Sequence, residues 1–177
     1  MKPQRITDPN DPLWAHILET YTTAFPSVER RDVGLLPDLL GDDSDFRSYA
    51  FCDGEHYIGF MHFWEFPTFH YLEHFAIISS TRRKGYGSRA LQWLLDQLPK
   101  DTPLILEVEL PEDELTRRRV AFYKRHGLYL LDTPYIQPPY RETDEEVPLR
   151  LMCTSEHLPE DAIRTLRSSV YGCTDEL

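Results

Sequence analysis

The sequence predicts an α/β protein, in which strands and helices alternate along the chain. Three observations predict this class. Residues 75–78 form an apolar, β-prone run that leads into a segment rich in cations and glycine, and then into leucines at helical spacing. Two strand-like runs of the same meander precede this unit, and they are joined at Asp53-Gly54, a dipeptide typical of a hairpin turn. Further strand and helix patterns alternate after it.

The first 45 residues predict one strand and two helices. A short strand is expected at residues 4–6. Asp11 can cap a helix that has Pro12 at its first position, and apolar residues then recur at helical spacing as far as Phe25. A second short helix is expected over residues 31–40, where Pro37 can break it.

The middle of the chain predicts the meander and the helix that follows it. Strands are expected at residues 46–52, 56–66 and 69–78, and the second is rich in aromatic side chains. After the glycine-rich segment, one helical face carries Leu91, Leu94, Leu95 and Leu98.

The last part of the chain begins with an apolar strand at residues 104–110. Glu107 and Glu109 share one face of this strand, an unusual place for carboxylates if the strand is central. The next helix ends near His126, before Gly127. We then expect strands at 128–131 and 147–153, a Pro-rich connection at 133–140, and a closing helix at about 159–170.

Length and charge limit the classes of protein. The 177 residues suit a single domain spanning 1–177. Thirty acidic and 19 basic residues give a net charge of −11, which argues against nucleic acid or an anionic membrane as the main partner. This balance agrees with a cationic substrate such as an amine, although acidity also serves solubility.

The cysteines and histidines predict neither a disulfide framework nor a metal site. Cys52, Cys153 and Cys173 are scattered and odd in number. His62, His70 and His74 do not have the spacing of a zinc site. The first residues lack the apolar core of a signal peptide, and no run is long enough to span a membrane. A reduced, cytoplasmic protein that contains no metal is expected.

The segment Arg82-Arg83-Lys84-Gly85-Tyr86-Gly87 predicts a phosphate site. The start of a helix leaves backbone N–H groups unpaired, and the helix dipole makes that end positive. Glycines let a ligand approach the backbone closely. The segment has neither the third glycine of a dinucleotide fingerprint nor the Gly-Lys-Ser/Thr of a phosphate loop.

Two motifs resemble those of the GNAT N-acetyltransferases. Arg82-x-x-Gly85-x-Gly87 is similar to that family's acyl-coenzyme A loop, Gln/Arg-x-x-Gly-x-Gly/Ala. Phe122-Tyr123, followed by Gly127, resembles the end of a helix in the same family. The order of the elements is also similar, and the resemblance covers mainly residues 46–131. Thr116 stands where the family often has asparagine.

The resemblance implies a fold, a donor and a binding site. The fold would be a mixed, mostly antiparallel sheet with helices on both faces. Acetyl-coenzyme A would be the donor, and the acceptor a small-molecule or peptide amine. The strand before the loop would pair with the pantetheine arm and polarise the thioester, while residues 104–110 splay away. The implied coenzyme-binding residues are Ala76, Ile77, Ile78, Arg82, Arg83, Lys84, Gly85, Tyr86, Gly87 and Ser88.

The resemblance also implies catalytic roles. Tyr123 would protonate the departing thiolate, although it could simply be a core aromatic residue. Glu73 would be the general base, with burial raising its pKa toward 7, or else a surface residue at the start of a strand. Glu107 and Glu109 are rivals, as the base or as ligands of an ammonium group. The connection that holds Tyr135, Gln137 and Tyr140 would line the acceptor pocket or serve only for loop packing.

Other functions stay open at this stage. The chain could use another acyl-coenzyme A, or it could be a regulatory module that binds coenzyme A without catalysis. No cysteine is placed as a nucleophile, which favours direct attack by the amine in a ternary complex. Either a monomer or a homodimer is expected.

Overall fold

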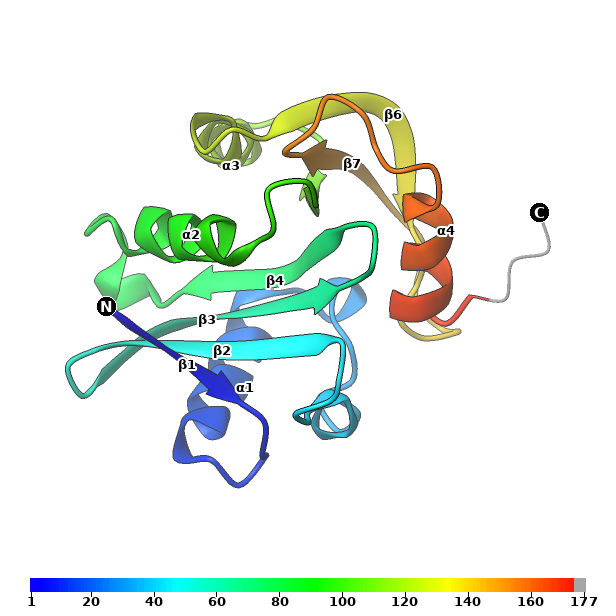
Figure 1. Cartoon of the computed structure of the whole chain (residues 1–177). Helices are drawn as coiled ribbons and strands as arrows, with labels where there is room; N and C mark the ends of the chain where they lie inside the picture. The colour runs from blue at the N-terminus through cyan, green and yellow to red at the C-terminus, as the bar shows by residue number, and fades with distance from the viewer. Residues whose placement is uncertain (174–177) are drawn as a thin grey trace.

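The computed structural model describes residues 1–173, which form a seven-stranded sheet in the order β1-β2-β3-β4-β5-β7-β6 (Figure 1). Only β4 and β5 are parallel, and all other neighbours are antiparallel. The predicted mixed, mostly antiparallel sheet is therefore confirmed. The strands are β1 (Lys2–Ile6), β2 (Phe46–Asp53), β3 (His56–Glu65), β4 (His70–Ile77), β5 (Leu104–Glu109), β6 (Tyr129–Gln137) and β7 (Val147–Cys153).

Helices cover both faces of this sheet, and each face has its own hydrophobic core. On one face, α1 (Pro12–Ala24) and the C-terminal helix α4 (Ala162–Thr165) pack against inward side chains of the strands. On the other face, α2 (Tyr86–Gln97) and α3 (Glu114–Arg125) bury a second apolar cluster. The face that carries α1 is called the α1 face below.

The first helix begins as predicted. The Asp11 carboxylate accepts a hydrogen bond from the backbone N–H of Leu13 at 2.8 Å, and Pro12 occupies the first turn. Trp14, Ile17 and Tyr21 point into the core of the α1 face.

The helix predicted over residues 31–40 is wrong. The structure has only one short 3-10 turn there, Leu36–Leu39, and another, Ser27–Glu29, just before the segment. Proline disfavours helical conformation in the residue before it and has no N–H to donate, so Pro37 begins a turn and does not continue a helix. The carboxylate of Asp32 also accepts the N–H of Gly34, which forms a local turn instead of a helix.

Strand β6 is longer than predicted. It continues through Pro134 as far as Gln137, over residues that the sequence assigned to a Pro-rich connection. Proline is tolerated because β6 lies at the edge of the sheet and its pairing with β7 shifts register between Leu130 and Pro134. Tyr135 and Gln137 therefore stand on a strand of the sheet.

The parallel strands β4 and β5 separate soon after they meet. They pair only at His70–Leu104, Tyr71–Ile105 and Leu72–Leu106, although β4 continues to Ile77 and β5 to Glu109. The backbone of each strand beyond these pairs faces a gap instead of a neighbouring strand. This pair of strands is therefore open at one end.

Candidate active site

A cleft of about 460 Å³ lies at the separated ends of β4 and β5. Its walls come from both strands, from the end of α1, from α3 and from the end of β6 with the residues after it. The predicted site residues that line it are Glu73, Ala76, Ile77, Arg82, Glu107, Glu109, Tyr123 and Tyr140.

A β-bulge sets the direction of Glu73. His62 of β3 pairs with His74, and the next residue, Phe63, pairs with Leu72, so Glu73 is an extra residue in β4. A bulge redirects side chains that would otherwise alternate between the two faces. Glu73 and His74 consequently both contact residues of the α1 face: Glu73 reaches Trp64, and the ring of His74 lies 4.7 Å from that of Tyr21.

The Glu73 carboxylate is enclosed by hydrogen-bond donors. Arg31 Nε lies 2.9 Å from Oε1, the Trp64 indole N–H donates to Oε2 at 2.6 Å, and the Tyr140 hydroxyl donates to Oε1 at 2.8 Å. The Glu73 side chain is only 1% exposed. Burial alone would raise the pKa of Glu73, but the positive charge of Arg31, together with His74 and these hydrogen bonds, lowers it. The expected rise toward 7 is therefore wrong for Glu73.

Arg31 makes further contacts besides its ion pair with Glu73. Its guanidinium lies 5.4 Å from the ring centre of Trp64 and 5.2 Å from that of Tyr140, and it also donates to the carbonyl of Val170. The segment that was predicted to be helical thus supplies the counter-ion of Glu73.

Glu107 has the raised pKa that the sequence assigned to Glu73. The Tyr171 hydroxyl lies 2.9 Å from Oε1 and 2.8 Å from Oε2 of Glu107. The Tyr71 hydroxyl oxygen lies 3.1 Å from that of Tyr171. Within residues 1–173, no Arg, Lys or His nitrogen forms an ion pair with this carboxylate. Burial raises the pKa of Glu107 to about 7, and the tyrosine hydrogen bonds only reduce this rise.

The other predicted acceptor residues differ in position. Glu109 is partly exposed and forms an ion pair with Arg119 of α3. Tyr140 lines the cleft beside Glu73. Tyr135 is buried near Glu107 on β6 and is not among the residues that line the cleft.

Tyr123 lies on the opposite wall, on the buried side of α3. It lines the cleft and packs edge-on against Phe122, with 5.2 Å between the ring centres. Burial raises the pKa of the Tyr123 phenol to about 12, so the hydroxyl keeps its proton at neutral pH.

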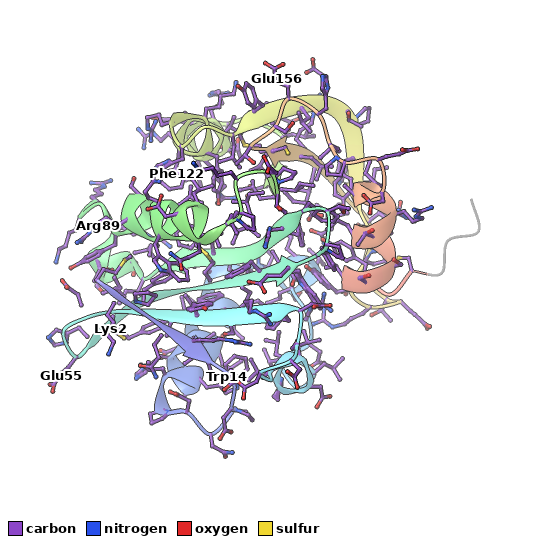
Figure 2. The ribbon with its side chains drawn as sticks, in the orientation of Figure 1. Lys2, Trp14, Glu55, Arg89, Phe122 and Glu156 are labelled. Carbon is purple, nitrogen blue, oxygen red and sulfur yellow. The ribbon has the colours of Figure 1, made fainter. Side chains whose placement is uncertain are left out.

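The glycine loop forms a second hollow of about 260 Å³ at the start of α2. Gly85 precedes the helix with φ 75°, a left-handed conformation that favours glycine, and Arg82 Nε donates to the Ile77 carbonyl at 3.1 Å. Ile77, Arg82 and Phe122 line both this hollow and the cleft, so the two spaces are neighbours. Phe122 lies between α3 and the start of α2 (Figure 2).

Most of the predicted coenzyme residues meet at this hollow. Its lining includes Ile77, Arg82, Arg83, Gly85, Tyr86, Gly87 and Ser88. Ala76 lines the cleft instead, and Lys84 is exposed and borders neither space. Ile78 lines a separate groove beside α1.

The histidines form no metal centre. His62 and His74 are buried among aromatic rings, and burial lowers the pKa of His62 to about 3 and also lowers that of His74. Throughout the described part of the chain, no group of His, Cys, Asp and Glu could hold a metal ion. Nor does any helix of residues 1–173 have the length and apolar character needed to cross a membrane.

Residues 12–128 match the model of a protein family described as the acetyltransferase (GNAT) family. The chain belongs to this family. A solved GNAT-family protein from Bacteroides thetaiotaomicron is 34% identical and has a TM-score of 0.88, with 98% of this chain and 100% of that chain covered. The comparison with curated proteins gave no match.

More distant GNAT structures share the fold at lower identity. The ribosomal-protein-S18-alanine N-acetyltransferase of Escherichia coli is 18% identical with a TM-score of 0.64, over 90% of this chain and 96% of that one. An aminoglycoside 6′-N-acetyltransferase solved with coenzyme A is 16% identical with a TM-score of 0.61, over 91% and 100%. Membership of the family supports an acyltransferase that binds coenzyme A.

Several residues of the site were not found from the sequence. Arg31, Trp64 and Tyr171 supply the partners of the two buried carboxylates, yet none belongs to a recognisable motif. Arg31 lay in a segment predicted to be helical, and Tyr171 lies just after the predicted last helix. Their roles follow from contacts between distant parts of the chain, which no local pattern encodes.

Proposed function

We propose that this GNAT protein transfers the acetyl group of acetyl-coenzyme A directly to an amine in a ternary complex. One observation carries the proposal: a single cleft has Tyr123 and Glu107 in its lining and shares Ile77, Arg82 and Phe122 with the hollow at the glycine loop. A phenol and a carboxylate of raised pKa are the acid and the base that such a transfer needs.

The donor would lie along β4. The backbone N–H groups at the start of α2, with Arg82 and Arg83, would hold the pyrophosphate. Beyond Leu72, the edge of β4 that faces β5 has no partner strand, so its N–H and C=O groups are available to the amides of the pantetheine arm. A backbone N–H near Ala76 would then polarise the thioester carbonyl.

Glu107 is the better general base of the two buried carboxylates. A base works best when its pKa lies near the operating pH, and burial brings that of Glu107 to about 7. Glu73 is already neutralised by Arg31, which leaves it little tendency to take a proton. Glu73 would instead hold Tyr140 and Arg31 in place around the acceptor.

Tyr123 would return a proton to the coenzyme thiolate. Its raised pKa, about 12, keeps the phenol protonated until the thiolate forms. A thiolate released into the same cleft is also desolvated, which raises its own affinity for a proton. Desolvation therefore raises the pKa of both the Tyr123 phenol and the coenzyme thiol. A cytoplasmic location belongs to this proposal and rests on the cysteine pattern of the sequence alone.

A thiol-release assay tests the reaction. The protein is mixed with acetyl-coenzyme A and a panel of amines, polyamines, aminoglycosides and short peptides, and with propionyl- or succinyl-coenzyme A in parallel arms. We expect amine-dependent thiol release with the acetyl donor. Faster release with another donor would indicate that the protein transfers that acyl group in place of acetyl. Absence of amine-dependent release with every donor would contradict catalysis.

The variant Tyr123→Phe tests the acid. We expect kcat to fall ~10²–10⁴-fold, with little change in the Kd for acetyl-coenzyme A, because the proton is needed only in the transition state. The exposed Tyr129 on β6 provides a matched control, and Tyr129→Phe should leave the rate unchanged. Single-turnover rates should be measured in case product release limits kcat. A folded Tyr123→Phe enzyme with a normal single-turnover rate would remove Tyr123 from the mechanism.

A further inference from the structure

Strand β6 carries a buried amide to the acceptor side of the cleft. Gln137 is 3% exposed and lines the cleft, and its Nε2 has no hydrogen-bond partner among residues 1–173. Most buried polar groups in native proteins have a partner, and leaving a donor without one is unfavourable. The missing partner of Gln137 is therefore best sought in a ligand of the cleft.

The pairing of the strands places this amide on the same face as the carboxylates. Tyr135 of β6 pairs with Leu149 of β7, which pairs in turn with Glu109 of β5. Paired residues share a face of a sheet, and so do alternate residues of a strand. Gln137, two residues after Tyr135, thus projects from the α1 face together with Glu109 and Glu107.

The chemistry of the amide restricts what can bind it. Nε2 is a donor, so its partner must have a lone pair, and an ammonium group has none. A carboxylate of the acceptor is disfavoured, because Glu29, Glu107 and Glu109 line the same cleft and would repel a further negative group. An uncharged oxygen, either an amide carbonyl or a hydroxyl, satisfies both conditions.

We propose that Gln137 determines specificity by donating a hydrogen bond to an uncharged oxygen of the acceptor. The preferred acceptors are then amines that also carry an amide carbonyl or a hydroxyl group. This inference rests on the proposed function, because it assigns the acceptor of the same reaction. Gln137 does not touch the reacting atoms in this scheme, and its contribution is to select and orient the amine.

A matched series of small amines tests the inference. Alaninamide, alaninol, alanine, 1,2-diaminopropane and sec-butylamine share the unit CH3–CH(NH2) and differ only in the group attached to it. We expect kcat/KM for alaninamide or alaninol to exceed that for sec-butylamine at least ~10-fold, as one well-placed hydrogen bond in a buried site allows. Preference for alaninamide indicates a peptide-like acceptor, and preference for alaninol a hydroxylated amine such as an amino sugar.

Two variants separate recognition from packing. Gln137→Met keeps the length of the side chain and removes the donor, so kcat/KM for alaninamide and alaninol should fall to that for sec-butylamine, and the preference for oxygen should disappear. Gln137→Glu keeps the shape and replaces the donor with a carboxylate, so it should favour 1,2-diaminopropane. It also serves as the second test if the methionine variant does not fold.

Thermal unfolding without any ligand supplies a readout independent of turnover. Because Nε2 has no partner to lose, Gln137→Met should melt at or above the wild-type temperature. A lower melting temperature with equal losses for every amine would overturn the inference and make Gln137 a structural residue. Wild-type enzyme that uses sec-butylamine or 1,2-diaminopropane as well as the better of alaninamide and alaninol would also overturn it, yet leave the proposed function standing. Absence of release with every amine, in this series and in the wider panel, would overturn both.

Discussion

Glu73 and Glu107 are buried carboxylates that line the same cleft, yet their environments shift their pKa values in opposite directions. Glu73 stands in a β-bulge and is surrounded by Arg31, Trp64 and Tyr140. Glu107 stands on a regular strand, and within residues 1–173 its hydrogen bonds come only from neutral hydroxyls. The difference shows that the counter-ion, more than burial, decides whether a buried carboxylate here stays ionised or becomes a base.

The largest expected effect comes from exchanging each carboxylate for its amide. Glu107→Gln should lower kcat ~10²–10⁴-fold and leave the melting temperature unchanged or higher, because it removes a base and also a buried charge without a counter-ion. Glu73→Gln should instead lower the free energy of unfolding by ~3–5 kcal/mol, because it leaves Arg31 buried without its partner. Measuring kcat and the free energy of unfolding in urea for both variants tests this difference. An active Glu107→Gln enzyme would mean that the base lies elsewhere.

Removing Arg31, the counter-ion of Glu73, tests the same ion pair through its other member. Arg31→Met should destabilise the protein by ~3–5 kcal/mol and raise the pKa of Glu73, since the charge that lowers it is gone. Arg118→Met is a matched control, because Arg118 pairs with Glu114 on the exposed surface of α3, and its loss should hardly change stability. Urea denaturation gives the free energies. Equal effects of the two substitutions would contradict the special role of the buried pair.

The dependence of stability on pH should also separate the two carboxylates, with a smaller effect. Glu107 has a folded pKa of about 7 against an ordinary value of 4.5, so its contribution is full below 4.5 and is lost as pH rises through about 7. Glu73 has a lowered pKa, so its contribution is present above its ordinary value and is lost only in acid. Between pH 5 and 8, wild type should therefore lose stability relative to Glu107→Gln. A constant difference between these two proteins over that range would contradict the raised pKa.

Local signals in the sequence were sufficient for much of the fold and for the coenzyme loop. Asp11 with Pro12 marked the start of α1, and Gly85 marked the start of α2, because capping and left-handed turns require particular residues. The motifs around Gly87 and Tyr123 identified the family. Each of these features depends on residues that are close together in the chain.

The part of the cleft around Glu73, Glu107 and Gln137 could not be predicted in the same way. The bulge at Glu73 depends on how β4 pairs with β3, and the partners of Glu73 and Glu107 come from residues 31, 64, 140 and 171. The extension of β6 to Gln137 depends on its position at the edge of the sheet. Contacts between distant segments decided all three features, and the pattern of single residues carries little information about them.

The separation of β4 and β5 has a consequence for the solubility of the protein. Two strands expose unpaired backbone in the middle of the sheet, and exposed strand edges can pair with another copy and begin aggregation. Inward-pointing charges are one way in which natural proteins protect such edges. Glu107 and Glu109 lie on β5 at this opening, and the chain as a whole carries a net charge of −11. These two carboxylates therefore also oppose self-association at this opening.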